Sequence, residues 1–179
     1  MSDSPTIASQ PAAAPVADPA LLKRMETEYR LTKQLSSGAS WFYWIAGLSV
    51  INTVISLTGG TTSFVTGLGT TQIIDALAMI LLEGASEGAI TLIRGLNIFF
   101  DLGAIALFVF FGIFAHKGHR WAFIVGMVIY FFDSLIFLLI ADYLSIAFHA
   151  LALWGLFNGM KASGELKKLQ YADAVIKPV

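Results

Sequence analysis

The sequence contains no cysteine, which excludes disulfide bonds, thiolate catalysis, iron–sulfur clusters and cysteine-ligated zinc. Charged residues are also scarce: they make up 13% of the chain, whereas a soluble domain carries about 25%. The net charge of -1 gives no reason to expect a nucleic-acid partner. The chain also lacks the phosphate-binding motif GxxxxGK followed by Ser or Thr, the zinc-protease motif HExxH and the dinucleotide-binding motif GxGxxG. No cofactor is therefore predicted.

Hydrophobic residues make up 56% of the chain, and its mean hydropathy is +0.74. They gather in four long runs, at residues 41–57, 96–115, 121–140 and 145–160. A helix needs about 20 mostly apolar residues to cross the hydrocarbon core of a bilayer. The sequence therefore predicts an all-α integral membrane protein, a four-span helical bundle whose transmembrane part covers residues 41–162 and whose first partner is the lipid bilayer.

A further segment, residues 62–93, is apolar in its first part but is broken by two glycines and carries Asp75. Counting it as a fifth span would move the basic loop HKGHR, residues 116–120, to the outer side of the membrane, against the positive-inside rule. We therefore expect a re-entrant or interfacial helical segment on the outer side. Its other two carboxylates, Glu83 and Glu87, are expected to be solvated in a loop.

The segments that flank the apolar runs are more polar. Residues 1–18 are rich in Ala and Pro and contain no apolar core, which predicts a disordered tail. Residues 19–38 have the pattern of an amphipathic helix, which would dock either on an anionic membrane surface or on a partner protein. Residues 163–179 are expected to form a second tail. Lys and Arg flank the runs so that the positive-inside rule places both termini in the cytoplasm, and a bacterial inner membrane is the predicted location.

Each apolar run contains one strongly polar residue in its outer half: Asn52, Asp101, Asp133 and His149. Such groups are costly in hydrocarbon unless they find a partner. The stripes that carry the first three are rich in small or polar residues, which mark the faces where membrane helices approach closely, so we expect the four groups to form one cluster. Two interpretations stay open: hydrogen bonds that join the helices, or a polar ligand or proton site. The second includes a hard metal ion held by Asp101, Asp133 and His149.

Two glycine motifs also have competing interpretations. Residues 84–88 match the serine-hydrolase pattern GxSxG, with Ser86 as its nucleophile, but the chain has no predicted strands from which to build the sheet that this motif requires. Gly155 and Gly159 form GxxxG in the fourth run. This spacing predicts close helix packing, either against the first run or against another subunit.

These patterns favour a non-enzymatic function, that of a scaffold or accessory subunit in a membrane complex. The partner would be another membrane protein or a second copy of the chain. The alternative is a transporter or a proton- or cation-handling protein that uses the buried polar cluster. An intramembrane hydrolase that uses Ser86 is a third interpretation, and it requires Ser86 to lie within hydrogen-bond reach of His149.

Overall fold

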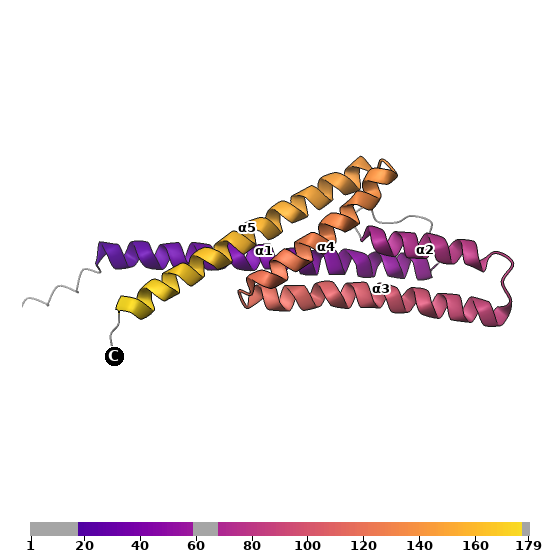
Figure 1. Cartoon of the computed structure of the whole chain (residues 1–179), viewed down its shortest axis with the longest axis horizontal. Coiled ribbons are helices and arrows are strands. Elements are labelled where there is room, and N and C mark those ends of the chain that lie inside the picture. Colours follow the sequence, from indigo (N-terminus) through magenta and orange to yellow (C-terminus); the bar gives the residue numbers. More distant parts are fainter. Residues whose placement is uncertain (1–17, 59–67, 177–179) are drawn as a thin grey trace, which may run out of the picture.

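The computed structural model describes residues 18–58 and 68–176, and in these two ranges the chain forms five helices and no strand (Figure 1). Four of the helices, α1, α3, α4 and α5, are long and apolar enough to cross a membrane. The prediction of an all-helical protein with four candidate spans is therefore confirmed. The helices are α1 (Pro19–Leu57), α2 (Gly69–Leu82), α3 (Glu87–His116), α4 (Arg120–Leu139) and α5 (Tyr143–Ile176).

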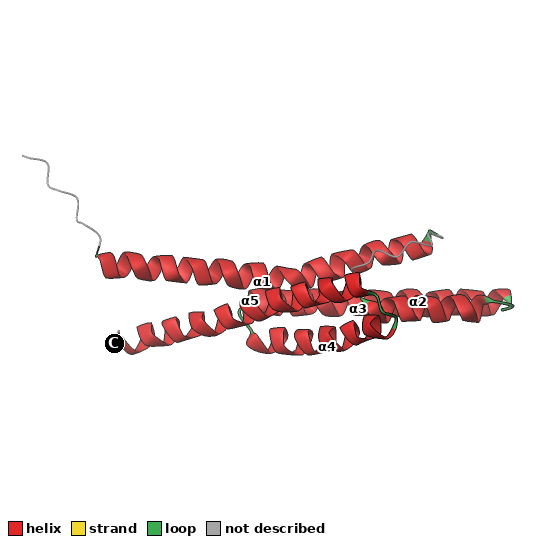
Figure 2. Ribbon diagram, turned by 90° about the horizontal axis from the view of Figure 1, so that it is seen from above, coloured by secondary structure: helices red, strands yellow, loops and turns green. Residues whose placement is uncertain are grey.

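Helix α1 runs without a break through two segments that the sequence suggested as separate elements, residues 19–38 and 41–57. Its 39 residues give it a length of about 58 Å, nearly twice the thickness of a hydrocarbon core. Helix α5 likewise continues to Ile176, through most of the segment expected to be a tail. The two helices lie side by side and extend together beyond α3 and α4 at one end of the molecule (Figures 1 and 2).

Close packing between α1 and α5 keeps both helices regular at this end of the bundle. A Cβ atom on Gly38 would lie 2.7 Å from the backbone nitrogen of Gly159, so only a glycine fits at this crossing. One turn further along α5, Ser163 is 1% exposed, and its hydroxyl donates a hydrogen bond of 2.8 Å to the carbonyl oxygen of Gly118. Residue 163 is therefore packed against the bundle.

Aromatic side chains fill the half of the bundle nearer to this end. Phe42 of α1 is fully buried, and its ring centroid lies 5.9 to 6.2 Å from those of Phe108, Phe111 and Phe123. Gly126 of α4 leaves room for Phe42, because a Cβ atom there would clash with the edge of its ring. The buried polar groups lie on the other side of this core, toward the ends of α1 and α4.

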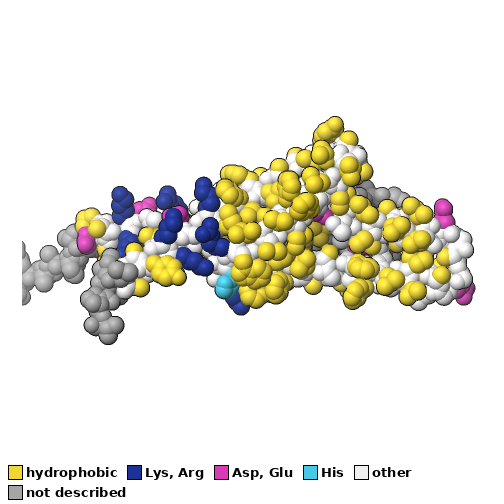
Figure 3. All heavy atoms as spheres, viewed as in Figure 1, with side chains coloured by type: hydrophobic (Ala, Val, Ile, Leu, Met, Phe, Trp, Pro, Cys, Tyr) yellow, Lys and Arg dark blue, Asp and Glu magenta, His cyan; other side chains and the backbone are white. Residues whose placement is uncertain are grey.

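Apolar side chains also cover the outside of the bundle. Phe99 and Leu139, for example, are 70% and 86% exposed. Figure 3 shows Lys and Arg gathered over the projecting parts of α1 and α5, while apolar side chains cover the rest of that face. An apolar surface of this extent is unusual for a monomer in water and is typical of contact with lipid.

Helix α2 begins well inside the bundle. The backbone nitrogen of Leu68 donates a hydrogen bond of 3.3 Å to the hydroxyl of Ser49, which lies eight residues, or about 12 Å, before the end of α1. From there α2 runs for about 21 Å along α3, too short to cross a hydrocarbon core. The chain therefore returns toward the middle of the bundle before it turns outward again.

The boundaries of this segment differ from the sequence-based expectation, which was one re-entrant or interfacial helical segment over residues 62–93. The helix instead ends at Leu82, because Gly84 adopts a positive φ of 72° in the turn that follows. Residues 87–93 are the first two turns of α3. Residues 62–67 lie outside the described residues.

Candidate functional site: two buried polar centres

The first polar centre is built around Asp133 of α4, whose carboxylate faces the start of α2. Its two oxygens accept hydrogen bonds from the backbone nitrogens of Gly69 and Thr70, both at 2.8 Å, and from the Thr70 hydroxyl at 2.6 Å. The first N–H groups of a helix have no partner within the helix. The residue that precedes α2, Leu68, cannot cap it with its side chain. Asp133 therefore caps α2 from a neighbouring helix, where the helix dipole also favours a negative charge.

His149 of α5 completes this centre. Its Nε2 atom lies 3.2 Å from Asp133 Oδ2, and its Nδ1 atom lies 2.7 Å from the carbonyl oxygen of Ser145. Because a carbonyl oxygen only accepts, Nδ1 carries the hydrogen in its bond to Ser145. The imidazole thus bridges Ser145 and the carboxyl group of Asp133, and the side chains of His149 and Asp133 are only 1% and 2% exposed. Tyr130 stacks on the imidazole ring at 4.3 Å and holds its orientation.

The second polar centre lies between α1, α2 and α3. Asp101 of α3 is fully buried, and its Oδ2 accepts a hydrogen bond of 3.3 Å from the hydroxyl of Thr53 on α1. One turn earlier on α3, the side-chain amide of Asn97 donates a hydrogen bond of 2.7 Å to Asp75 on α2. Within the described residues, Oδ1 of Asp101 and Oδ1 of Asn97 are buried and have no hydrogen-bond partner.

The four predicted cluster residues are thus distributed over two centres. Asp133 and His149 contact each other directly, whereas the hydrogen bond of Asp101 leads to α1 and its charged neighbour is Asp75. Asn52 is buried on α1 beside Thr53. In the part of the chain that the structure describes, no group of three or more His, Asp or Glu side chains is placed to hold a metal ion. The geometry thus gives no support to one ion shared by Asp101, Asp133 and His149.

Sequence reasoning did not identify the partners of these carboxylates. Asp133 binds mainly backbone N–H groups of Gly69 and Thr70, and a backbone group leaves no mark in the sequence. Thr53 resembles any other threonine in an apolar run. Asn97 did carry a signal, because it lies four residues before Asp101 and therefore on the same helix face.

The turn between α2 and α3 carries three of the predicted residues, Glu83, Ser86 and Glu87. Glu83 directly follows α2, and Ser86 and Glu87 mark the start of α3. His149 contacts Asp133, which caps the opposite end of α2, about 21 Å away along that helix. A nucleophile and its base must come within hydrogen-bond reach. The geometry therefore does not support a hydrolase that pairs Ser86 with His149.

Gly155 and Gly159 face α1 of the same chain. A Cβ atom on Gly159 would lie 2.8 Å from Cα of Gly38, and one on Gly155 would clash with the indole ring of Trp41. Of the two partners that the sequence left open for this motif, the structure places the first run against it.

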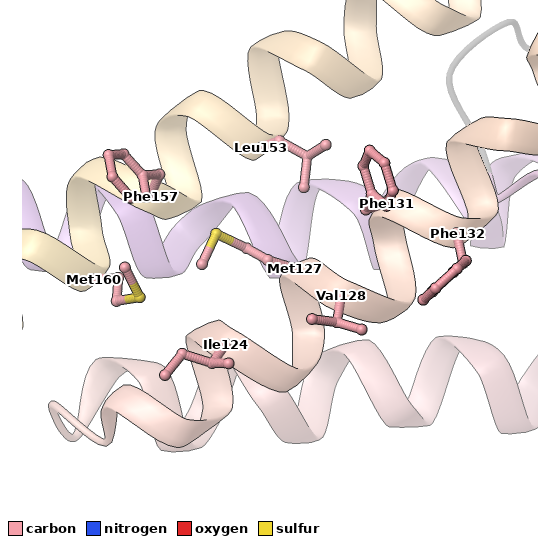
Figure 4. A pocket seen from close by; sticks show the side chains of 8 residues that line it. All are labelled: Ile124, Met127, Val128, Phe131, Phe132, Leu153, Phe157 and Met160. Carbon is pink, nitrogen blue, oxygen red and sulfur yellow. The ribbon is translucent and has the colours of Figure 1, made fainter.

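A groove on the outside of α4 and α5 is separate from both polar centres (Figure 4). Met127 and Phe131 of α4 line it together with Leu153 and Phe157 of α5, and its other lining residues are apolar too. It offers no polar group to orient a polar substrate, and its chemistry suits lipid acyl chains.

Comparison of the chain with protein-family models, with curated proteins and with solved structures finds no match. Its function is therefore inferred from the arrangement of its own residues. Asp133 and His149 have hydrogen-bond partners from three helices, which is what a structural junction requires. Asp101 and Asn97 each keep one unpaired acceptor, so the second centre has capacity for a further ligand.

Proposed function

We propose that this protein is a non-enzymatic accessory subunit or scaffold of a membrane complex, which docks a partner on the projecting part of α1. Four spans anchor it, α2 re-enters from the outer side, and both termini lie in the cytoplasm. The observation that carries the proposal is an apolar stripe on α1 that neither the bundle nor the bilayer covers. It consists of Leu22, Met25 and Tyr29, which are 52%, 59% and 70% exposed.

The bundle leaves this stripe uncovered because α1 is covered on another face. Thr27, Leu31 and Leu35 mark the covered face: Thr27 and Leu31 are half-buried, and Leu35 is 7% exposed. At 100° per residue, Met25 and Tyr29 lie about 120° and 160° around the helix from Leu31. An exposed apolar stripe with polar residues on either side is typical of a protein interaction site.

The bilayer does not reach this stripe either, because α1 is continuous. Met25 lies 16 residues, or about 24 Å, before the apolar run that begins at Trp41. The headgroup region adds only about 5–8 Å to each side of the hydrocarbon core. A helix that lay flat on the membrane surface would need a bend between the two segments, and α1 runs through this junction unbroken (Figure 1). The partner-docking interpretation is therefore favoured over the membrane-surface interpretation.

The chemistry of the stripe favours an amphipathic, net acidic helix of another protein. Lys23, Arg30 and Lys33 lie on the same segment as the stripe, and basic residues there outnumber Glu26 and Glu28. Helices that dock through an apolar face present anchor residues at positions i, i+3 and i+7. On α1, this is the spacing of Leu22, Met25 and Tyr29. Opposite charges at the rim would add specificity and speed of association more than affinity.

A test is to place a photo-crosslinking amino acid at Met25 in the full-length protein in its native membrane. The control places the same amino acid at Thr27, which is half-buried. We expect a discrete adduct with one protein from position 25, and an adduct within the chain from position 27. The triple variant Leu22→Ser, Met25→Ser, Tyr29→Ser should reduce the native mass of the solubilised complex, whereas Tyr171→Ser, at an exposed aromatic residue on the projecting part of α5, should not.

Three results would contradict the proposal. Adducts with lipid alone would mean that the stripe contacts the membrane surface. An adduct of twice the 19.3 kDa chain mass would mean that the stripe binds a second copy. A native mass that is the same for the wild type and the triple variant would mean that the stripe carries no partner.

A further inference from the structure

Two buried oxygen atoms in the second polar centre lack a donor. Asp101 Oδ1 and Asn97 Oδ1 both lie on the face of α3 that is turned toward α1 and α2. The Asn97 side chain is oriented by its amide nitrogen, which donates to Asp75, so the atom that remains is an acceptor. A buried acceptor without a partner costs about 1–3 kcal/mol, and more when it is charged. Two such acceptors one helical turn apart form a site that a hydrogen-bond donor or a cation would stabilise.

The surroundings of these atoms consist of oxygen ligands. Thr53 contributes a hydroxyl from α1, and Asp75 contributes a second carboxylate from α2. The negative charge of Asp75 also acts on Asp101. In the described part of the chain, no Lys, Arg or His forms an ion pair with either carboxylate. Carboxylate, amide and hydroxyl oxygens are ligands for hard cations.

We propose that Asp101 Oδ1 and Asn97 Oδ1 bind one exchangeable cation, a proton or a sodium ion, where α1, α2 and α3 meet. A proton on Asp101 would donate a hydrogen bond to Asn97 and satisfy both atoms. A sodium ion would be coordinated by the same two oxygens, with the Thr53 hydroxyl and Asp75 beside them. A divalent ion fits less well, because Ca²⁺ takes six to eight oxygen ligands.

The first polar centre provides the contrast that makes this inference specific. Asp133 is buried to a similar degree, yet both its oxygens accept hydrogen bonds, and Nε2 of His149 lies 3.2 Å from Oδ2. Asp101 has one hydrogen bond, of 3.3 Å, from a neutral hydroxyl. The site lies near the end of α1, because Thr53 is four residues, or about 6 Å, before Leu57. It lies at the middle of α3, because Asp101 is 14 residues, or about 21 Å, after Glu87.

The experiment is labelling of the intact protein in lipid nanodiscs with an apolar carbodiimide, which adds to protonated carboxyl groups in apolar surroundings. Adducts are located by mass spectrometry across pH 5 to 9, in choline chloride and in NaCl of equal ionic strength. We expect labelling at Asp101 and none at Asp133. If the bound cation is a proton, the rate of Asp101 labelling should fall about tenfold per pH unit above the midpoint of its pH profile. If it is a sodium ion, saturating NaCl should suppress the labelling of Asp101 at least about tenfold and raise the melting temperature of the protein.

Variants separate binding from folding. Asp101→Asn has the same shape and should abolish both the adduct and any effect of sodium on the melting temperature. Asn97→Leu removes the second acceptor but keeps the Asp101 carboxyl, so it should weaken sodium protection and shift the pH midpoint. Asp142→Asn removes a half-buried carboxylate at the turn between α4 and α5, and it should change neither the labelling of Asp101 nor the effect of sodium.

The titratable group that faces Asp101 is Asp75 on α2, whereas α1 faces it with the neutral Thr53. Asp75→Asn should therefore move the midpoint of labelling to lower pH, because it removes a negative charge that favours the protonated form of Asp101. Labelling of Asp101 at one rate from pH 5 to 9, with no response to sodium, would overturn the proposal, since the proton would then be permanent. Absence of an Asp101 adduct together with no effect of any cation on the melting temperature would also overturn it.

Discussion

The carboxylate of Asp133 is the group on which the position of α2 depends most directly. It accepts two backbone N–H groups and one hydroxyl from the first two residues of α2, and it pairs with His149. We predict that Asp133→Asn releases the start of α2 from the bundle while leaving α1, α3, α4 and α5 assembled. Those four helices pack on one another through their own apolar faces, so they do not need α2 to stay together.

The size of this effect follows from the contacts. Removing one partner of a buried ion pair costs about 3–5 kcal/mol. The variant should lie at the lower end, because the amide oxygen of asparagine can still accept from the N–H and hydroxyl of Thr70. Its amide NH2 group, however, would then face the N–H of Gly69, where two donors meet without an acceptor. We therefore expect about 3 kcal/mol, which corresponds to a roughly 100-fold change in the opening equilibrium.

Because the chain has no cysteine, one introduced thiol can be followed by its reaction with a maleimide. Thr71 is 2% exposed in the first turn of α2, so Thr71→Cys places a single protected thiol at the point of interest. The rate of its reaction with a water-soluble maleimide in nanodiscs reports how often α2 opens. In the Asp133→Asn background this rate should rise roughly 100-fold relative to the Thr71→Cys parent.

The matched control is Asp142→Asn, which removes a different carboxylate at a nearby helix start. Asp142 caps α5 and not α2, so the thiol at position 71 should react at the parental rate. A rate in the Asp133→Asn variant within about threefold of the parent would refute the reasoning. Such a result would mean that packing of α2 on α3, and not the carboxylate, holds α2 in place.

Three further predictions concern the stability of the bundle, each measured by denaturant titration of the purified protein in mixed micelles. Gly38→Ala should destabilise it by about 1–3 kcal/mol because the new methyl group meets the backbone of α5, whereas Gly47→Ala, with nothing within 4 Å, should stabilise it by up to about 1 kcal/mol. Equal effects of these two substitutions would contradict the crossing geometry. Tyr130→Phe should be neutral or stabilising, because the Tyr130 hydroxyl is buried without a hydrogen-bond partner among the described residues; a clear loss of stability would show that it has one. The hydroxyl of Ser145 donates a hydrogen bond to Asp142 and holds the pKa of that carboxyl below its ordinary value of 3.8. The contribution of Asp142 to stability should therefore be fully present above that value and be lost as the pH falls below it, and Asp142→Asn should remove this pH dependence.

The candidate site was predictable in its residues but not in its connections. Asp101, Asp133 and His149 were identifiable because charged groups in apolar runs are rare and costly. Polar groups buried at similar depth in four helices predicted one shared cluster. The start of α2 inside the bundle separates them, because its N–H groups bind the carboxylate of Asp133, and Asp101 faces Asp75.

The sequence by itself determined the helical class and the four candidate spans, because a long apolar run in a chain with few charges has essentially one way to satisfy its backbone in lipid. It also determined which residues are costly to bury. Only the tertiary structure decided that residues 19–57 form one helix, that α2 begins beside Ser49, and that Asp101 and Asp133 lie in separate centres. These features depend on contacts between residues far apart in the chain and on backbone donors, and side-chain patterns along a sequence encode neither.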